Sequence, residues 1–180
     1  MKNKIVLDLD NTLVCTVHKH SMLRSINDRQ IYFPLQYIDI DEEHISYLRP
    51  YLFDFLDSIF QQFDVSVFTA AGTGYANTVV DKIFSNYHLD ALLSNPEYQD
   101  CLYLNGKHKY IDYIGTKING YERGNTRIID DSNLVAMSNP DNIIHIKAFD
   151  ILTFGGELNM DCLKDNELKK LMDYFNNGYF

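Results

Sequence analysis

Two carboxylates near the start of the chain have a spacing that suits chemistry. The stretch IVLDLDNTLV places Asp8 and Asp10 after a short β-branched and aliphatic run, which is typical of a buried parallel strand. Residues i and i+2 of a strand point the same way, so both carboxylates could share one side of its end. Like charges held this close repel, and one should titrate abnormally unless a cation lies between them. The pair therefore predicts a cation site with nucleophilic or acid–base chemistry.

Two later strands are expected to end in reactive side chains as well. The apolar segment VSVFT ends in Thr69, and TRIID ends in Asp130, which Asp131 follows. In open α/β sheets, ligands bind beyond the carboxyl ends of the strands. We therefore expect these side chains to converge with the first pair of carboxylates.

Carboxylates clustered in this way suit phosphoryl transfer. One carboxylate can attack phosphorus, and a second can protonate the leaving alkoxide and then deprotonate the attacking water. The negative charge of Asp8, Asp130 and Asp131 would repel a phosphate dianion, so a hard cation, Mg²⁺ by preference, is expected. A hydroxyl such as that of Thr69 and a lysine would stabilise the equatorial phosphate oxygens. Each feature taken alone also fits a turn, a strand end or a solvated charge.

Strands alternate with helical patterns along the chain. Beside the three strands above, the apolar segments 31–40 and 142–146 are expected to be strands. Apolar residues at helical spacing favour helices over 49–63, 75–87 and 164–175. This alternation predicts an α/β fold, a doubly wound and mainly parallel sheet with helices on both faces.

The composition is that of a globular chain with a net acidic charge. The 180 residues suit one domain with a sizeable core, and the formal net charge is −9. Binding to nucleic acid or to an anionic membrane rests on Lys and Arg, so this charge argues against both. Three separated cysteines indicate reduced thiols, and no apolar run is long enough for a signal peptide or a membrane span. We expect a soluble intracellular protein, cytoplasmic or nuclear, and the sequence does not indicate its oligomeric state.

The motifs resemble a known family when taken in order. DLDNT, FTA, a lysine near position 109 and IIDDS resemble the motifs of the haloacid dehalogenase superfamily of phosphohydrolases. The finer resemblance is to the small phosphatases that act on the C-terminal domain of RNA polymerase II. It is carried by LRPYLFDFL, VSVFTAAGTGYANTVVDKI, CLYLNGKHKYIDYIG and NIIHIKAFD. The similarity covers roughly the whole chain and implies a single phosphatase domain over 1–180.

The resemblance implies a role for each acidic residue. Asp8 would be the phosphoryl-accepting nucleophile and a metal ligand. Asp10 would be the acid and base, and would also give its backbone carbonyl to the metal. Asp131 would be a further metal ligand, whereas Asp130 would orient the lysine. Thr12 would support the loop that carries the first two aspartates.

The phosphate itself would be bound by a hydroxyl and a lysine. By resemblance, Thr69 is the phosphate-binding hydroxyl and Lys109 the lysine that neutralises the phosphate. The spacing before this lysine is shorter than in the family, which leaves Lys107 open as the alternative. The sequence also departs from the family pattern at Asn133, where Pro is usual, and at Ala71, where Ser is frequent.

The segment of about residues 15–46 fits the strand–helix alternation less well. It is polar and then alternating, which predicts a small β-hairpin inserted after the first strand. It carries Arg24, Arg29 and Tyr32, and a basic edge beside an apolar patch suits a phosphorylated, proline-containing peptide. We therefore expect these three side chains to bind substrate. Alternatively, the apolar residues only pack the hairpin onto the sheet.

The expected function is an Mg²⁺-dependent phosphatase that forms an aspartyl-phosphate. By resemblance, its partner is a protein or peptide that carries phosphoserine or phosphothreonine. An inactive adaptor with the same fold is an alternative, but it should lose motif residues and carry a transit peptide and a membrane span. A phosphatase of nucleic-acid ends or of small metabolites is another. The acidic charge disfavours the former, and the lack of a full cap domain disfavours the latter.

Overall fold

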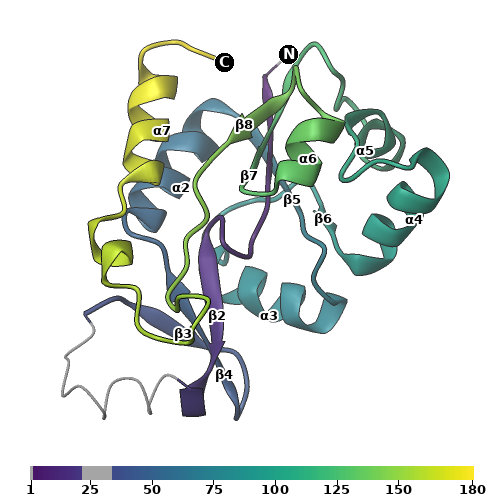
Figure 1. Ribbon diagram of the computed structural model, residues 1–180. Helices are drawn as coiled ribbons and strands as arrows, with labels where there is room; N and C mark the ends of the chain where they lie inside the picture. The colour runs from purple at the N-terminus through teal and green to yellow at the C-terminus, as the bar shows by residue number, and fades with distance from the viewer. Residues whose placement is uncertain (1, 22–33) are drawn as a thin grey trace.

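A parallel sheet forms the centre of the computed structural model, which describes residues 2–21 and 34–180 (Figure 1). Its strands lie in the order β6-β5-β1-β7-β8, and every neighbouring pair is parallel. β1 is therefore flanked by a strand on each side, as its short apolar run predicts. The strands are β1 (Lys4–Leu7), β5 (Asp64–Phe68), β6 (Leu92–Leu93), β7 (Thr126–Asp130) and β8 (Ile143–His145).

Helices cover both faces of this sheet, as expected. Alternation along β1 sends Ile5 and Leu7 into one apolar cluster and Val6 into another. The helices around the first cluster are α2 (Leu52–Gln62), α3 (Thr73–Ile83) and α7 (Glu167–Asn176). Those around the second are α4 (Asn95–Asn105), α5 (Ile111–Lys117) and α6 (Asn133–Ser138). Figure 1 shows α2 and α7 on one side of the sheet and α4, α5 and α6 on the other.

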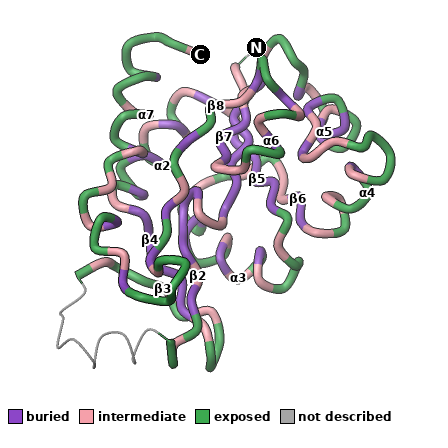
Figure 2. The backbone as a smooth tube through the Cα atoms, viewed as in Figure 1, coloured by how far each residue is buried: buried purple, intermediate pink, exposed green. Residues whose placement is uncertain are grey.

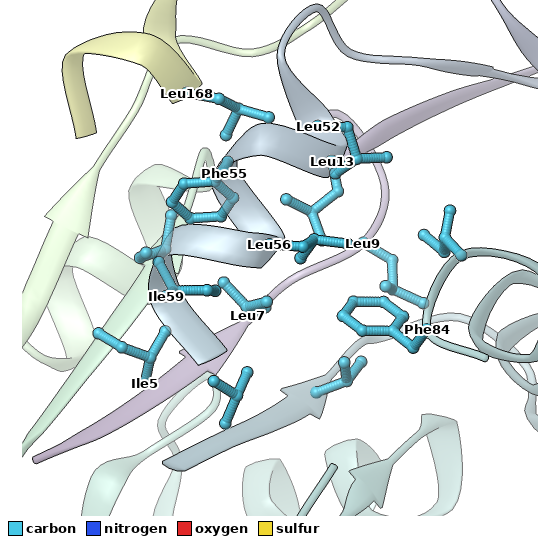
Figure 3. Packing of buried hydrophobic residues seen from close by; sticks show 14 of the residues in the cluster. Ile5, Leu7, Leu9, Leu13, Leu52, Phe55, Leu56, Ile59, Phe84 and Leu168 are labelled. Atoms are coloured by element: carbon cyan, nitrogen blue, oxygen red, sulfur yellow. The ribbon is translucent and has the colours of Figure 1, made fainter. Parts of the chain in front are cut away.

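The larger cluster includes an apolar core between β1 and the helix α2. Figure 3 shows Phe55, Leu56 and Ile59 of α2 close to Leu7 and Ile5. All five side chains are fully buried. Figure 2 shows burial along the described residues, with buried residues in the central strands and exposed residues on the outer helices and loops.

The predicted insertion after β1 is present as a small antiparallel sheet. Its strands lie in the order β2-β4-β3, so the described part has three strands where a hairpin of two was expected. Cys15, Val17, Ile45 and Tyr47 of this sheet pack with residues of the segment from 149 to 162. The strands are β2 (Val14–His18), β3 (Tyr37–Asp39) and β4 (His44–Leu48).

Several element boundaries differ from the predicted ones. The helix expected over 49–63 begins at Leu52, after Tyr51 in a left-handed conformation (φ 67°). The strand expected over 31–40 is limited to β3 within the described residues, and it lies in the insertion sheet. The helix expected over 164–175 is α7, which begins at Glu167, and Lys164 belongs to the preceding 3₁₀ helix η1 (Met160–Lys164).

Three helices were missed by the spacing of apolar residues. α4 buries only Cys101, α5 has seven residues and α6 has six, so none carries a long apolar stripe.

None of the helices in the described parts of the chain has the length and apolar character needed to cross a bilayer.

Candidate active site

Six of the side chains predicted to be functional meet at the carboxyl edge of the parallel sheet. β1 pairs with β5 and with β7, and Leu7 lies opposite Val67 and Ile129. The residues that follow these positions therefore leave the sheet at the same edge, as the strand ends predicted. They open into a cavity of about 240 Å³, and the predicted residues that line it are Asp8, Asp10, Thr69, Lys109, Asp130 and Asp131.

Lys109 is the centre of a buried cluster of charges. Its Nζ lies 2.5 Å from Asp8 Oδ1 and 2.6 Å from Asp130 Oδ2, and its side chain is 4% exposed. The alternative lysine, Lys107, has its Nζ 3.9 Å from the centre of the Tyr110 ring and does not line the cavity. Lys109 is thus the lysine that the fold brings to the predicted nucleophile.

The backbone of Lys109 takes a left-handed conformation (φ 46°), which is uncommon for a residue other than glycine. Asn139, in turn, donates from its side-chain amide to the carbonyls of His108 (3.2 Å) and Lys109 (3.3 Å). Its Oδ1 accepts from the backbone N–H of Ile111 at 3.0 Å. One buried amide therefore holds the turn that aims the lysine into the cavity.

Burial shapes the charges of this cluster. Burial raises the pKa of the Asp8 carboxyl to about 7, Lys109 opposes that shift, and the charge of Asp130 adds to it. Burial alone would lower the pKa of Lys109, but the two aspartates outweigh burial and raise it. Burial also raises the pKa values of Asp10 and Asp131. The lysine is therefore cationic at neutral pH, in a site that still carries an excess of carboxyl groups.

The donor atoms of this site fit a hard divalent cation. One carboxylate oxygen from each of Asp8, Asp130 and Asp131 lies within 4.8 Å of the others. Both oxygens of Asp130 are engaged, because Oδ2 accepts from Lys109 and Oδ1 accepts from the backbone N–H of Ser132 at 2.8 Å. Asp8 and Asp131 are therefore the carboxylates best placed as ligands, and oxygen donors are the ones that Mg²⁺ prefers.

Thr12, expected to support the loop, and Thr69, expected to bind phosphate, each contact a loop that borders the cavity. Thr12 donates from its hydroxyl to Asp131 Oδ1 at 3.1 Å, which links the loop after β1 to the loop after β7. Thr69 is 1% exposed, and its hydroxyl oxygen accepts from the backbone N–H of Ala71 at 3.1 Å. That contact uses the oxygen of Thr69 and not the hydroxyl proton, which a phosphate oxygen could accept.

Arg49 holds the loop that carries the aspartates, a contact that the sequence did not indicate beyond a helix start. Its guanidinium donates to the backbone carbonyl of Thr12 at 2.9 Å and to that of Lys147 at 2.6 Å. The same group forms a two-bond ion pair with Asp165, at 2.9 and 2.8 Å. Arg49 is 1% exposed, so its buried charge depends on these protein partners. Through them the side chain ties three segments of the chain together.

Asp10 has a partner that no spacing in the sequence predicts. The hydroxyl of Tyr75, in α3, donates to Asp10 Oδ1. Thr16 Oγ1 lies 2.5 Å from that hydroxyl, and Ser46 Oγ lies 2.5 Å from Thr16 Oγ1. The predicted acid and base is therefore connected to β2 and β4 of the insertion sheet. Arg24, Arg29 and Tyr32, the side chains predicted to bind substrate, lie outside the described residues.

The comparisons with known proteins agree with this geometry. Residues 3–179 match the family model described as NLI interacting factor-like phosphatase. Protein 355R of Invertebrate iridescent virus 6, named as a CTD phosphatase-like protein, is 29% identical over 98% of each chain. The human carboxy-terminal domain RNA polymerase II polypeptide A small phosphatase 1 is 24% identical over 95% of this chain and 57% of its own length.

A solved structure gives the same fold. Fission yeast Fcp1, an RNA polymerase II CTD phosphatase, superposes with a TM-score of 0.66 at 16% identity, over 98% of this chain and 51% of that chain. The present chain thus spans about half the length of this solved relative. The expected haloacid dehalogenase fold and the resemblance to CTD phosphatases are both confirmed. From the match over nearly its whole length, this chain belongs to the NLI interacting factor-like phosphatase family, whose members are phosphoric monoester hydrolases.

Proposed function

We propose that this protein hydrolyses phosphomonoesters through an aspartyl-phosphate on Asp8. The observation that supports the proposal most directly is the contact between Asp8 Oδ1 and Lys109 Nζ. This contact directs one oxygen of the carboxylate toward the lysine ammonium. The other oxygen is then the one to attack phosphorus, and the ester oxygen of the substrate leaves. Lys109 and the Thr69 hydroxyl would stabilise the charge on the equatorial phosphate oxygens.

Asp10 serves both halves of this reaction. In the first half it gives its proton to the departing ester oxygen, which leaves as an alcohol. In the second half the same carboxylate removes a proton from water, whose oxygen attacks the phosphorus of the aspartyl-phosphate. Inorganic phosphate leaves, and Asp8 and the protonated Asp10 are restored. The raised pKa of Asp10 suits a group that must hold a proton in one step and accept one in the next.

Mg²⁺ would be held by the side chains of Asp8 and Asp131 and by the backbone carbonyl of Asp10. When bound, it would neutralise negative charge on the phosphoryl group and the carboxylates. Thr12 and Asp130 would act by orienting neighbouring side chains of the site. Thr12 orients Asp131 through its hydroxyl, and Asp130 orients Lys109.

We infer that the substrate is a phosphoserine or phosphothreonine in an extended peptide, for which the RNA polymerase II tail is the first candidate. The named activities of the viral and human relatives support this class. Such a substrate would place the protein in the nucleus or the cytoplasm. The clustering of Asp8, Asp10, Thr69 and Lys109 in one cavity favours a working enzyme over an inactive adaptor.

A panel of substrates tests this function. Phosphate release should be measured with Mg²⁺ on serine- and threonine-phosphorylated peptides, mononucleotides and sugar phosphates. We expect kcat/KM to be highest for the peptides, and we expect a chelator to remove the activity until Mg²⁺ is restored. Activity confined to nucleotides or sugar phosphates would reject the peptide substrate, and full activity in the chelator would reject the metal.

A further inference from the structure

A chain of hydroxyl groups runs from the insertion sheet to Asp10. Ser46 lies in β4 and is fully buried, Thr16 lies in β2, and Tyr75 lies in the first turn of α3. The oxygens of Ser46 and Thr16 are 2.5 Å apart, as are those of Thr16 and Tyr75. The last hydroxyl contacts Asp10 Oδ1. Three separate elements therefore converge on one carboxyl oxygen of the catalytic cavity.

The direction of every proton in this chain follows from its last member. A carboxylate has only acceptor sites, so Tyr75 must donate to Asp10 Oδ1. A hydroxyl has one proton, and because Tyr75 has used its own, Thr16 is the donor in the next contact. By the same argument Ser46 donates to Thr16. The three hydroxyl dipoles are aligned, which strengthens the bond that reaches Asp10.

We propose that Tyr75, held by Thr16 and Ser46, is a positioning residue that keeps the acidic proton of Asp10 on Oδ2. With Oδ1 accepting from the tyrosine hydroxyl, a proton added to the carboxyl is favoured on Oδ2, because a protonated Oδ1 would be the weaker acceptor for Tyr75. A proton on Oδ1 that points toward Tyr75 would require all three hydroxyl groups to reverse. This inference rests on the proposed function of Asp10 as general acid, and it adds a residue that sets where the acid carries its proton.

The position of Tyr75 allows its hydroxyl to be tested apart from its ring. The ring is half-buried and packs against the larger apolar cluster, so Tyr75→Phe should keep that packing. Tyr87 supplies a matched control, because its hydroxyl donates to Asp57 Oδ1 at 2.7 Å and it does not line the catalytic cavity. Tyr87→Phe removes the same kind of bond elsewhere in the fold.

The experiment compares two leaving groups. Phenyl phosphate releases a phenol with a pKa of about 10, like that of a tyrosine side chain, and this leaving group needs a proton. 2,4-Dinitrophenyl phosphate releases a far more acidic phenol, which leaves without one. In Tyr75→Phe we expect kcat/KM to fall by about 10- to 100-fold for phenyl phosphate and by less than about threefold for the dinitrophenyl ester. Tyr87→Phe should change neither value.

Thr16→Val provides a second variant in which Tyr75 itself is intact. We expect the same preference for the acidic leaving group, with a loss of about threefold to tenfold for phenyl phosphate. Equal losses for both esters in Tyr75→Phe, or no loss for phenyl phosphate, would overturn the proposal. If Asp10→Asn loses kcat/KM equally on both esters, Asp10 is not the acid, because kcat/KM does not include the later hydrolysis of the aspartyl-phosphate. That result would reject the proposed function together with this inference, whereas a selective loss in Asp10→Asn alone would reject only the role of Tyr75.

Discussion

The parallel sheet carries a lysine between two aspartates at each of its two ends. At the amino end Lys4 contacts Asp64, and its Nζ lies 3.9 Å from Asp90. At the carboxyl end Lys109 bridges Asp8 and Asp130. The exposure of the side chains separates the two clusters, since Asp64 is 33% exposed at the first end and Asp130 is 1% exposed at the second.

This difference in burial decides what each cluster can do. The charges at the amino end remain partly in water, so their contacts contribute little to stability and need no special geometry. The charges at the carboxyl end have lost their water, and each one depends on the others for compensation. The cluster at the carboxyl end is therefore costly to the fold and well suited to chemistry, because burial raises the pKa of the Asp8 carboxyl and the contacts with Lys109 fix the positions of both aspartates.

Asparagine substitutions give the largest contrast between the two ends. Asp8→Asn should lower kcat for an aryl phosphate by about 10⁴-fold or more, because an amide cannot form the phosphoryl intermediate. Asp64→Asn, the matched change at the amino end, should leave kcat within about twofold, since Asp64 does not line the cavity. Steady-state kinetics with Mg²⁺ would measure both. Similar kcat values for the two variants would contradict the role of Asp8 as the nucleophile.

Replacing the lysine at each end of the sheet compares how much the two clusters contribute to the free energy of unfolding. Lys109→Met leaves Asp8 and Asp130 buried without their cation, and we expect the free energy of unfolding to fall by about 3–5 kcal/mol. Lys4→Met should cost no more than about 1 kcal/mol, because its partners stay partly in water. Urea unfolding in a chelator, at a pH above 8, would measure both changes. The account would be wrong about the carboxyl-end cluster if the two costs were equal.

The pH dependence of Mg²⁺ binding gives a smaller effect. The pKa of Asp8 is raised to about 7, so below that pH the carboxyl holds a proton that the metal must displace. The apparent affinity for Mg²⁺ should therefore fall as the pH is lowered through about 7, by up to about tenfold for each pH unit, and level off above it. Calorimetry in buffers of different ionisation enthalpy would also count the protons released. A pH-independent affinity with no proton release would contradict the expected protonation of Asp8.

The sequence predicted which side chains gather at the carboxyl edge of the sheet because the signals for them are local. Asp8 and Asp10 sit at the end of an apolar run, and a parallel sheet must bring such strand ends to one edge. The choice between Lys107 and Lys109 stayed open in the sequence, since two residues of spacing decide it. The left-handed backbone of Lys109 and the Asn139 amide settle which side chain enters the cavity.

The supporting contacts could not be predicted, because they join positions far apart in the chain. Arg49 carried the signal of a helix start, and its ion pair with Asp165 depends on where α7 returns to the core. In the sequence, Tyr75 is one aromatic residue of an expected helix. Its contact with Asp10 depends on how α3 packs against the insertion sheet. The helix α4 was missed because it buries a single residue and so lacks an apolar stripe.

The central claim is that Asp8 receives the phosphoryl group, and trapping that group tests it most directly. Wild type, Asp10→Asn and Asp8→Asn would be mixed with ³²P-labelled phosphopeptide, quenched in acid, and mapped by mass spectrometry for an acid-stable, base-labile acyl phosphate. The account predicts label on Asp8 in wild type and none in Asp8→Asn. In Asp10→Asn the label should form slowly, because the ester oxygen leaves without a proton, and persist, because the attacking water is not deprotonated. Phosphate release by wild type and by Asp10→Asn without labelled Asp8 in either would contradict the account.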